Sequence, residues 1–224
     1  RRGDAVLTVL LASLVPGLFW LWYFNRYDVR DKEPVSRLML CMFFGALGVI
    51  PALSWEAPFS QLLKASNSLP VQLGLSFFVV GLGEEFFKLV AVYLAVARSE
   101  HFNEPIDGII YAIATAIGFS VVENTLYISA FGLMVAPLRG TIATLAHIAF
   151  SGLAGYFLGK ARFSSRPLPQ IASGLATAAF THGLYDFLLI TRLVSPLVLI
   201  LVILGLQYIL LMAIQTSVKS WQGR

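Results

Sequence analysis

Long apolar runs recur along this 224-residue chain, and they constrain its fold more than any other feature. Runs of about 18 residues or more are long enough for an α-helix to cross a bilayer, whereas outer-membrane strands are about ten residues long and alternate in polarity. Hydrophobic residues make up 58% of the sequence and charged residues only 12%, against about 25% charged residues in a typical soluble domain. The sequence therefore predicts an all-α, polytopic membrane protein.

The positions of the apolar runs predict about seven transmembrane helices, bundled in a single domain that covers residues 1–224. The expected spans are 5–24, 35–55, 71–97, 106–131, 138–163, 170–190 and 196–216. Between the second and third spans, residues 56–70 have the mixed polarity of a segment that lies along the membrane surface. In the fifth span, Gly152, Gly155 and Gly159 have a spacing that lets two helices approach closely.

Basic residues are unevenly distributed between alternate loops, which predicts the orientation of the chain. The loops after the first, third and fifth spans, with the C-terminal tail, hold most of the loop Lys and Arg, including Arg26, Arg30, Lys32, Arg98 and Arg162. Because basic loops stay in the cytoplasm, we expect a multi-pass plasma-membrane protein with its N-terminus outside and its C-terminus cytoplasmic. The net charge of +4 then reflects contact with membrane lipids, and nucleic acid is not expected as a partner.

Ionisable residues interrupt the third apolar run, in the stretch Gly81-Leu-Gly-Glu-Glu-Phe-Phe-Lys88. A charged side chain near the bilayer centre costs roughly 2.5–3.5 kcal/mol, so such residues usually face a bundle interior or a water-filled cavity. Glu84 and Lys88 share one helix face, and Glu85 lies about 100° around the helix from Glu84. A purely structural ion pair explains Glu84 and Lys88 as well as a functional role does.

Three further spans carry polar residues at a comparable depth. Glu123 lies in the fourth span and His147 in the fifth, while His182 and Asp186 share one face of the sixth. With a rise of about 1.5 Å per residue, Glu123, His147 and His182 each lie on the order of 12–14 Å from the outer end of their span. This convergence of acid and imidazole groups from four helices indicates an active site.

Blander explanations exist for single members of this set. Interhelical hydrogen bonding accounts for four of the polar residues taken one at a time, namely Asn124, Thr144, Ser151 and Thr181. His182 and Asp186 could form a self-satisfied pair, which is also the geometry in which a carboxylate orients a functional imidazole. The whole set, by contrast, favours a hydrated pocket, because water removes most of the cost of inserting its charges.

Carboxylates and imidazoles in a small hydrated pocket are suited to the activation of water. One glutamate takes a proton from water as general base and returns it to a leaving amine, while imidazoles stabilise the oxyanion. The predicted catalytic residues are Glu84, Glu85, His147 and His182. The predicted supporting residues are Lys88, Glu123, Asn124 and Asp186. Lys88 would tune the glutamate pair, Asp186 would orient His182, and Glu123 and Asn124 would line the pocket.

Three alternatives remain open from the residues alone. A zinc ion would use Glu85, Glu123, His147 and His182 as ligands, although no HExxH motif is present and the two histidines lie in different spans. For this reason no cofactor is favoured. A proton- or cation-coupled transporter would use the same carboxylates and would show ion flux that depends on Glu84 and Glu85. A non-catalytic scaffold would lose stability, but no activity, on mutation.

The order of these motifs resembles the PrsW family of intramembrane proteases over roughly residues 27–187. The matching stretches are YDVRDKEP, GEEFFK, DGIIYAIATAIGFSVVENTLY, HIAFSGLAGYFLGKARF and HGLYDF. In the related CAAX-protease and bacteriocin-processing proteins, the motifs EExxxR, FxxxH and HxxxN/D line a glutamate-type site. Glu84-Glu85 matches the first motif, with Lys88 one residue before the position of the Arg. Phe119-xxx-Glu123 has Glu in place of His in the second, and His182-xxx-Asp186 matches the third.

This resemblance implies an intramembrane endopeptidase of the glutamic type. It also implies that the substrate is a single-pass membrane protein, namely an anti-sigma factor that the family cuts at its first cleavage site, which releases a stress-response sigma factor.

Overall fold

The computed structural model describes residues 2–222, and every regular element in that range is helical. The long helices are α1 (Arg2–Asn25), α2 (Val35–Glu56), α5 (Leu82–Val96), α6 (Pro105–Phe131), α8 (Thr144–Arg162), α9 (Pro167–Thr191) and α10 (Pro196–Gln222). The short α-helices are α3 (Ser60–Ala65), α4 (Leu69–Gly74) and α7 (Ala136–Leu138). Two 3₁₀ turns, η1 (Ala57–Phe59) and η3 (Leu133–Val135), and two π-helical segments, η2 (Leu75–Gly81) and η4 (Arg139–Ala143), complete the set. Residues 1 and 223–224 of the expected domain 1–224 lie outside the described residues.

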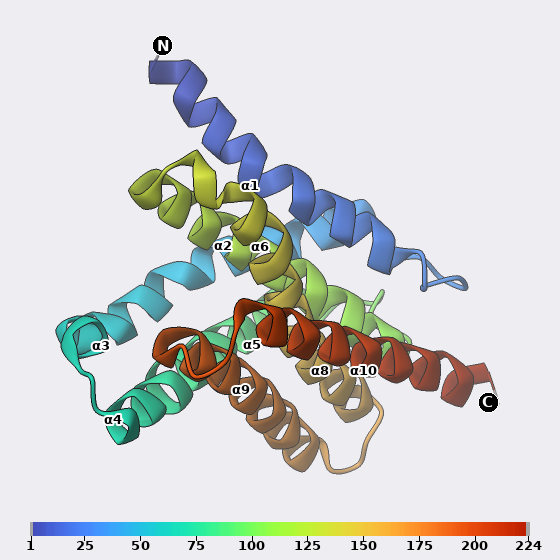
Figure 1. The fold of residues 1–224 in the computed structure, drawn as a ribbon. Coiled ribbons are helices and arrows are strands. Elements are labelled where there is room, and N and C mark those ends of the chain that lie inside the picture. Colours follow the sequence, from blue (N-terminus) through green and yellow to red (C-terminus); the bar gives the residue numbers. More distant parts are fainter. Residues whose placement is uncertain (1, 223–224) are drawn as a thin grey trace.

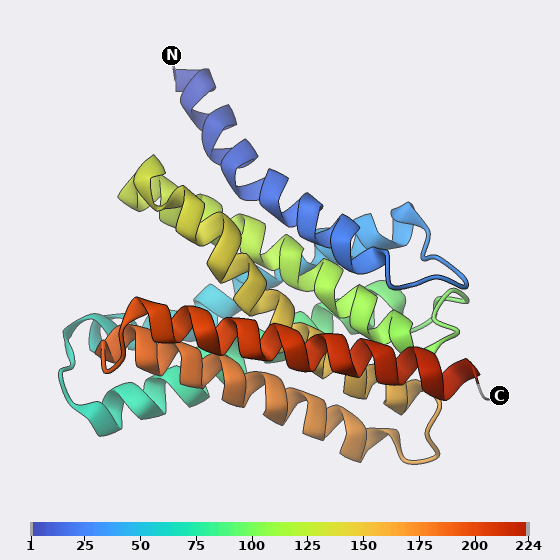
Figure 2. The ribbon, with the colours of Figure 1, turned by 45° about the vertical axis from the view of Figure 1, so that its right-hand side comes forward.

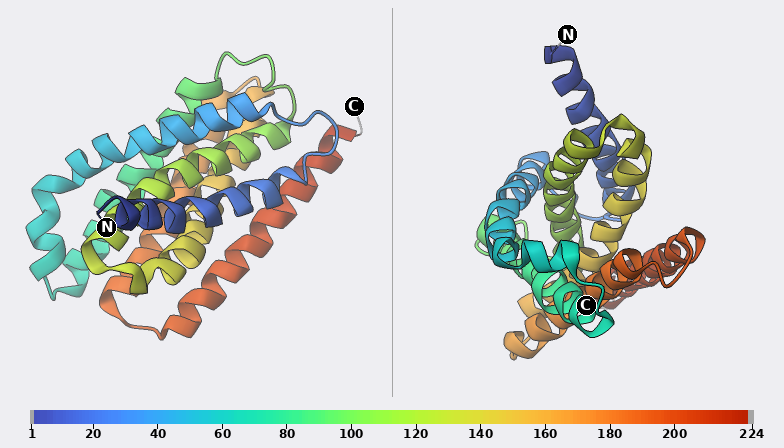
Figure 3. Two further views of the ribbon diagram at one scale, coloured as in Figure 1. Left: turned by 90° about the horizontal axis from the view of Figure 1, so that it is seen from above. Right: turned by 60° about the vertical axis from the view of Figure 1, so that its left-hand side comes forward.

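The long helices run back and forth between the two ends of an elongated bundle (Figures 1 and 2). One end carries the turns 26–34, 97–104 and 163–166 and the C-terminal end of α10 (Figures 2 and 3). The other end carries the start of α1, the short helix α3 and the turn between α9 and α10. Successive long segments are therefore antiparallel, as expected for a polytopic membrane protein.

Five stretches of the described residues are long and apolar enough to cross a membrane. They are Val6–Asn25, Val35–Leu63, Pro105–Phe131, Leu133–Arg162 and Pro196–Trp221. The helical stretch 69–96 and α9 do not belong to this group, since both carry ionisable side chains in otherwise apolar sequence. The predicted all-α fold with several membrane-spanning helices is thus confirmed.

Helix α6 forms the centre of the bundle and packs against α8, α2 and α1. Its contact with α8 is close because glycines line it: a Cβ on Gly159 would lie 2.0 Å from the carbonyl oxygen of Pro105. A Cβ on Gly155 would lie 2.4 Å from the carbonyl oxygen of Gly108. The close helix approach predicted from the glycine spacing of the fifth span is confirmed, although a Cβ on Gly152 would lie nearest to Leu210 of α10.

Four of the first six predicted spans agree with the helical stretches to within three residues. The helical stretch of the second continues to Leu63, and that of the fifth starts five residues earlier, at Leu133. Two of the six spans are not uniform α-helix. The third consists of α4, the π-helical η2 and α5, and the fifth begins with the π-helical η4. Apolar periodicity does not reveal such segments, because a π-turn adds only one residue to an α-helix. In η2 the carbonyl of Val79 accepts a hydrogen bond of 3.1 Å from Trp55 Nε1 on α2.

The last helix and the segment 56–70 differ from the expectation in detail. Helix α10 continues to Gln222, six residues beyond the predicted end at 216. Polar residues such as Ser217 and Lys219 end the apolar run but not the helix, and a Lys in the last turn complements the helix dipole. The mixed-polarity segment 56–70 forms η1, α3 and the start of α4 at one end of the bundle.

Candidate active site

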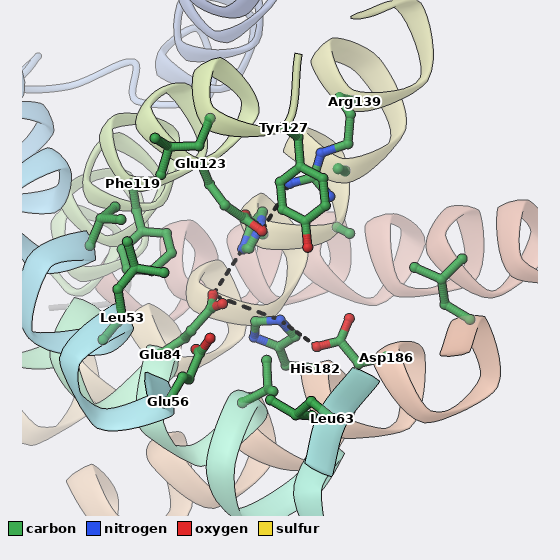
Figure 4. A pocket seen from close by; sticks show the side chains of 18 of the residues that line it. Leu53, Glu56, Leu63, Glu84, Phe119, Glu123, Tyr127, Arg139, His182 and Asp186 are labelled. Carbon is green, nitrogen blue, oxygen red and sulfur yellow. Dashed lines mark hydrogen bonds and ion pairs between the residues drawn. The ribbon is translucent and has the colours of Figure 1, made fainter. Parts of the chain in front are cut away.

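A cavity of about 530 Å³ opens between α2, α5, α6, α8 and α9, near the end of the bundle that carries α3 (Figure 4). Its ionisable lining residues are Glu56, Glu84, Glu123, Arg139, His147, His182 and Asp186. Most of the remaining wall is apolar and includes Val49, Leu53, Leu126, Phe131 and Leu189. The four helices that were expected to place acid and imidazole groups at one depth therefore do bring them to one cavity.

Helix α5 supplies the glutamate pair and its counter-ion. Lys88 lies one turn after both acids, and its Nζ donates to Glu85 Oε1 at 2.7 Å and to Glu84 Oε2 at 3.1 Å. The ammonium also lies 4.3 Å from the ring centroid of Phe119 on α6. Lys88 is 1% exposed, so this ion pair is shielded from solvent. The shared face predicted for Glu84 and Lys88 is present, and Glu85 joins them through the i,i+3 position.

His147 on α8 is held at both ring nitrogens. Nδ1 lies 2.8 Å from Lys88 Nζ, and Nε2 lies 2.7 Å from Glu123 Oε2 on α6. Because an ammonium only donates, Nδ1 accepts, and Nε2 carries the proton that it donates to Glu123. The second oxygen of Glu123 pairs with Arg139 Nη2 at 2.9 Å. This chain of contacts fixes the imidazole in one orientation.

His182 on α9 lies between three carboxylates. Nδ1 is 3.0 Å from Glu85 Oε1, while Nε2 is 3.3 Å from Asp186 Oδ2 and 3.9 Å from Glu84 Oε2. The ring of Phe150 stacks on the imidazole at a centroid distance of 4.8 Å. Asp186 therefore contacts His182 across one helical turn, as the sequence spacing predicts.

The two glutamates of α5 occupy different environments. Both oxygens of Glu85 are used, since Oε1 accepts from Lys88 and contacts His182, and Oε2 accepts from Ser151 Oγ at 2.7 Å. Glu84 lines the cavity, and its Oε2 lies 4.0 Å from His147 Nδ1. Glu84 is thus the member of the pair that faces the space where a water molecule and a substrate would bind (Figure 4).

Glycines bring α9 close enough to α5 for these contacts. A Cβ on Gly81 would lie 2.7 Å from the carbonyl oxygen of Ala179, and a Cβ on Gly183 would lie 2.7 Å from Cα of Phe77. Any side chain at these two positions would push the helices apart. Because Gly183 follows His182 directly, this close packing also places the imidazole against Glu85.

Asn124 does not belong to the wall of the cavity in this structure, and its hydrogen bonds join α6 to α8. Its Nδ2 donates to Ser120 Oγ at 3.1 Å and to Thr144 Oγ1 at 3.0 Å, while its Oδ1 accepts from Arg139 Nε at 3.0 Å. Asn124 is fully buried, and its amide is satisfied by these partners. The expectation that it lines the pocket is therefore wrong, and the alternative, interhelical hydrogen bonding, describes it.

Two residues at the site have no predicted role there. Arg139 lies at the start of the fifth expected span, and in the structure it pairs with Glu123 and lies 4.0 Å from the ring centroid of Tyr127. Its spacing of eight residues from His147, about two helical turns, was the available signal. The interhelical hydrogen bond predicted for Ser151 is present, since its Oγ donates to Glu85 on α5. Glu56 follows the second expected span directly, and nothing in its sequence position predicts that it lines the cavity.

A possible metal-binding group lies within this constellation. Glu84, His147 and His182 each offer one ligand atom, and these atoms all lie within 4.8 Å of one another. The ligand set expected from the sequence names Glu85 and Glu123 instead. In the structure those two carboxylates contact the opposite ring nitrogens of the histidines, at His182 Nδ1 and His147 Nε2. They occupy the position from which a carboxylate orients a ligating imidazole.

Comparison with known proteins agrees with this arrangement. The family described as "PrsW family intramembrane metalloprotease" matches residues 33–214. Protease PrsW of Geobacillus kaustophilus is 31% identical over 188 residues, which cover 84% of this chain and 82% of that protein. Protease PrsW of Bacillus subtilis is 30% identical over a region that covers 82% of this chain and 84% of that protein. Protease PrsW of Clostridioides difficile is also 30% identical, over 88% of this chain and 85% of that protein.

No solved structure matches this chain. The match of the family to residues 33–214 includes every ionisable residue of the cavity and most of the helical bundle. The chain therefore belongs to the PrsW family of intramembrane proteases.

Proposed function

We propose that this protein hydrolyses a peptide bond of a membrane-anchored protein, with Glu84 as the general base that takes a proton from water. The observation that carries this proposal is the placement of Glu84. It is the member of the glutamate pair that lines the cavity, and its Oε2 lies 3.9–4.0 Å from a ring nitrogen of each histidine. These distances are longer than a hydrogen bond, so the Glu84 carboxylate can shift toward a water molecule and a scissile carbonyl when they bind.

The other residues have positioning roles in this mechanism. Glu85 holds Lys88 and His182 in place, and Asp186 contacts the second nitrogen of His182. His182, whose Nε2 lies 3.3 Å from Asp186 and 3.9 Å from Glu84 Oε2, is the imidazole that stabilises the negative charge developing on the carbonyl oxygen, while His147 is held by Lys88 and Glu123. The proton taken by Glu84 passes to the leaving amine, which leaves a carboxyl group and an amine as products. The positive charge of Lys88, which donates hydrogen bonds to both glutamates, offsets the cost of burying their negative charges.

The wall of the cavity supports a peptide substrate that arrives from the membrane. Apolar side chains of α2, α6 and α9 line it on three sides, including Leu53, Leu126 and Leu189. Such a surface suits the apolar segment of a single-pass protein. Family membership favours hydrolysis over the alternative of an ion-coupled carrier. We therefore propose a single-pass membrane protein, such as an anti-sigma factor, as the substrate.

A zinc-dependent form of the same reaction is the second candidate, and one specific observation favours it. Glu84, His147 and His182 present ligand atoms within 4.8 Å of one another, and a Glu-His-His set is a catalytic zinc ligand set. Each histidine also contacts a carboxylate through its other ring nitrogen. These residues fit a zinc ion once Lys88 Nζ leaves His147 Nδ1, whose lone pair it occupies in this structure. When bound, zinc acts as a Lewis acid and lowers the pKa of water. The family description also names metalloproteases.

We further propose that the chain forms one domain with about seven transmembrane helices, its C-terminus cytoplasmic and its N-terminus outside. The arrangement of the loops supports this orientation. The turns that hold Arg26, Arg98 and Arg166 lie at the same end of the bundle as the C-terminal end of α10. Basic residues gathered at one end are typical of the cytoplasmic side of a plasma-membrane protein.

Cleavage of a panel of co-expressed single-pass membrane proteins tests the proposal. Wild type should release soluble fragments of at least one substrate, while Glu84→Gln, Glu85→Gln and His182→Ala should release none. Glu100→Gln, which alters an exposed glutamate in a loop, serves as the matched control and should cleave like wild type. Cleavage by Glu84→Gln at the wild-type rate would overturn the role of Glu84.

The metal content of the same purified proteins separates the two candidates. The general-base mechanism predicts full activity in wild-type protein that contains no bound metal. The zinc-dependent form predicts one zinc per chain, loss of that zinc in Glu84→Gln and His182→Ala, and recovery of cleavage when zinc is returned to stripped wild type. Zinc that binds equally to the variants would exclude the group at Glu84, His147 and His182 as its site.

A further inference from the structure

A second cluster of buried carboxylates lies far from the cavity, at the opposite end of the bundle. Asp28 and Glu33 come from the loop between α1 and α2, and Asp107 comes from the first turn of α6. One oxygen of each lies within 4.8 Å of the others. All three side chains are nearly inaccessible, with exposed fractions of 1%, 4% and 0%. Asp107 and Glu123 are sixteen residues apart on α6, which corresponds to about 24 Å.

The hydrogen bonds of this cluster leave two carboxylate oxygens without a partner. Asp28 Oδ2 accepts from the backbone N–H of Glu33 at 3.2 Å, and Glu33 Oε2 accepts from the hydroxyl of Tyr111. Asp107 Oδ2 caps the helix by accepting from the backbone N–H of Glu104 at 2.6 Å. Glu33 Oε1 and Asp107 Oδ1 are buried and accept no hydrogen bond from a neighbouring N–H or hydroxyl group, although the two carboxyl groups lie close enough to share a proton. Such orphaned acceptors are rare in folded proteins and need an explanation.

The cluster also lacks a basic counter-ion. Within the described part of the chain, no Lys, Arg or His nitrogen pairs with Asp28, Glu33 or Asp107, whereas the glutamates of α5 share Lys88. Buried carboxylates are normally paired with cations or coordinated to metals, because desolvation makes an isolated charge costly. The missing partner is therefore a cation from solution or a set of bound protons.

We propose that Asp28, Glu33 and Asp107 bind one divalent cation of the hard class to which Ca²⁺ and Mg²⁺ belong. Carboxylate oxygens are the ligands that such ions prefer, and oxygens bound at 2.3–2.6 Å to one Ca²⁺ are at most about 5 Å apart. The observed spacing of the three donors, within 4.8 Å, meets this limit. The two oxygens without partners supply the ligand atoms that the hydrogen bonds do not use.

A cation at this position would tie the loop between α1 and α2 to the start of the central helix. The loop already touches the neighbouring turn through the hydrogen bond from Asn103 Nδ2 to Asp31 Oδ2 at 2.8 Å. The ion would add three contacts between the same parts of the chain and would remove the repulsion of three buried acids. It would therefore stabilise the packing of α1 and α2 on α6 without contact with the catalytic residues.

Thermal unfolding of the full chain in detergent, after removal of metals with EDTA, tests this site. Addition of Ca²⁺ or Mg²⁺ to about a hundred times its Kd should raise the Tm by roughly 5–10 °C, while K⁺ at equal ionic strength should not. The increase should disappear in Asp28→Asn and persist in Asp31→Asn, which alters an exposed acid of the same loop. It should also persist in Glu84→Gln, which separates this site from the cavity.

A direct binding measurement completes the test and does not depend on how well the variants fold. Tb³⁺, a hard ion with Ca²⁺-like preferences, should bind wild type, and light absorbed by the adjacent Tyr111 should excite its luminescence. Ca²⁺ should displace it, and Glu33→Gln should reduce the signal. Equal Tm increases in wild type and Asp28→Asn, or no effect of either ion on wild type, would overturn the proposal in favour of protons shared between the acids.

Discussion

Ser151 Oγ donates a hydrogen bond of 2.7 Å to Glu85 Oε2, and this contact joins α8 to α5, the helix that carries the glutamate pair. With it, Glu85 has a partner at each oxygen and does not line the cavity. The bond therefore separates the roles of two adjacent glutamates. Glu85 is held as part of the scaffold, and Glu84 is left to face the space where substrate would bind.

Removal of this hydroxyl should slow cleavage without abolishing it. A hydrogen bond to a charged group contributes about 1.5–3 kcal/mol. If its loss raises the activation free energy by that amount, Ser151→Ala should cleave roughly 10- to 100-fold more slowly. The rate of substrate cleavage in membranes measures this. Ser173→Ala removes a hydroxyl that bonds only within exposed α9, and it should cleave like wild type. An unchanged rate in Ser151→Ala would show that Glu85 does not need this partner.

Loss of the buried ammonium should damage both stability and activity. Lys88→Met leaves Glu84 and Glu85 without their cation, and breaking a buried ion pair costs about 3–5 kcal/mol. The Tm of the purified protein should fall sharply and cleavage should stop. Addition of Glu85→Gln to Lys88→Met should restore part of the Tm but no cleavage, because it removes one uncompensated charge.

The matched control for this experiment is Lys160→Met, which alters an exposed lysine near the end of α8 and should leave both quantities unchanged. Equal stability of Lys88→Met and wild type would contradict the assignment of Lys88 as the counter-ion.

A single methyl group should separate two closely packed helices, α6 and α8. Gly159→Ala places a Cβ 2.0 Å from the carbonyl oxygen of Pro105, so α6 and α8 must move apart. We expect the free energy of unfolding to fall by at least the roughly 1–3 kcal/mol typical of overpacking. The Tm should therefore be lower, and the variant should accumulate poorly in the membrane. Gly205→Ala on α10 is the control, since nothing lies within 4 Å of its added Cβ, and it should be neutral or slightly stabilising. The same Tm for both variants would argue against the close contact of α6 with α8.

Stability should depend on pH through the acidic cluster in the loop between α1 and α2. Burial raises the pKa of Glu33 to about 8 and that of Asp28 to about 6, both above the values of about 4 that the unfolded chain has. The folded protein thus holds these protons more tightly, and the resulting stabilisation is complete below about pH 4 and is lost as the pH rises through 6 and then 8. In EDTA, the Tm should fall between pH 5 and pH 9.

Glu33→Gln should remove the upper part of this decrease, because glutamine does not titrate. Glu100→Gln should keep the wild-type slope. A Tm of wild type that rises between pH 6 and pH 9 in EDTA would contradict the burial of this cluster.

The sequence predicted the parts of the site that depend on position along single helices. The rise per residue of a helix places Glu84, Glu123, His147 and His182 at similar depths, which predicts that they lie together. The spacing of one helical turn likewise predicts the contact of His182 with Asp186. Contacts between different helices could not be predicted in this way. Nothing in the sequence says that Ser151 faces α5 or that Asn124 faces Ser120 and Thr144 across the α6–α8 contact.

Arg139 shows the limit most clearly. It lies at the start of an expected span, where a long basic side chain typically reaches the membrane surface. In the structure, Glu123 and the ring of Tyr127 provide it with partners inside the bundle, and only the fold reveals that these partners are near. The π-helical segments were equally hidden, since one additional residue does not disturb the apolar pattern of a helix.

The π-helical segment η2 directly precedes α5, and this has a consequence for the length of the chain between α4 and the glutamates. A π-turn holds one residue more than the α-helical turn that could replace it. Deletion of one residue within 75–81 would allow continuous α-helix with the flanking segments still in register, whereas closure of the π-turn without a deletion would turn everything upstream by about 100° relative to Glu84. The carbonyl of Val79 would return to the α-helical ladder, and Trp55 would lose its acceptor. The widened turn of η2, and not the identity of the glutamates alone, thus sets which way α5 presents them to the cavity.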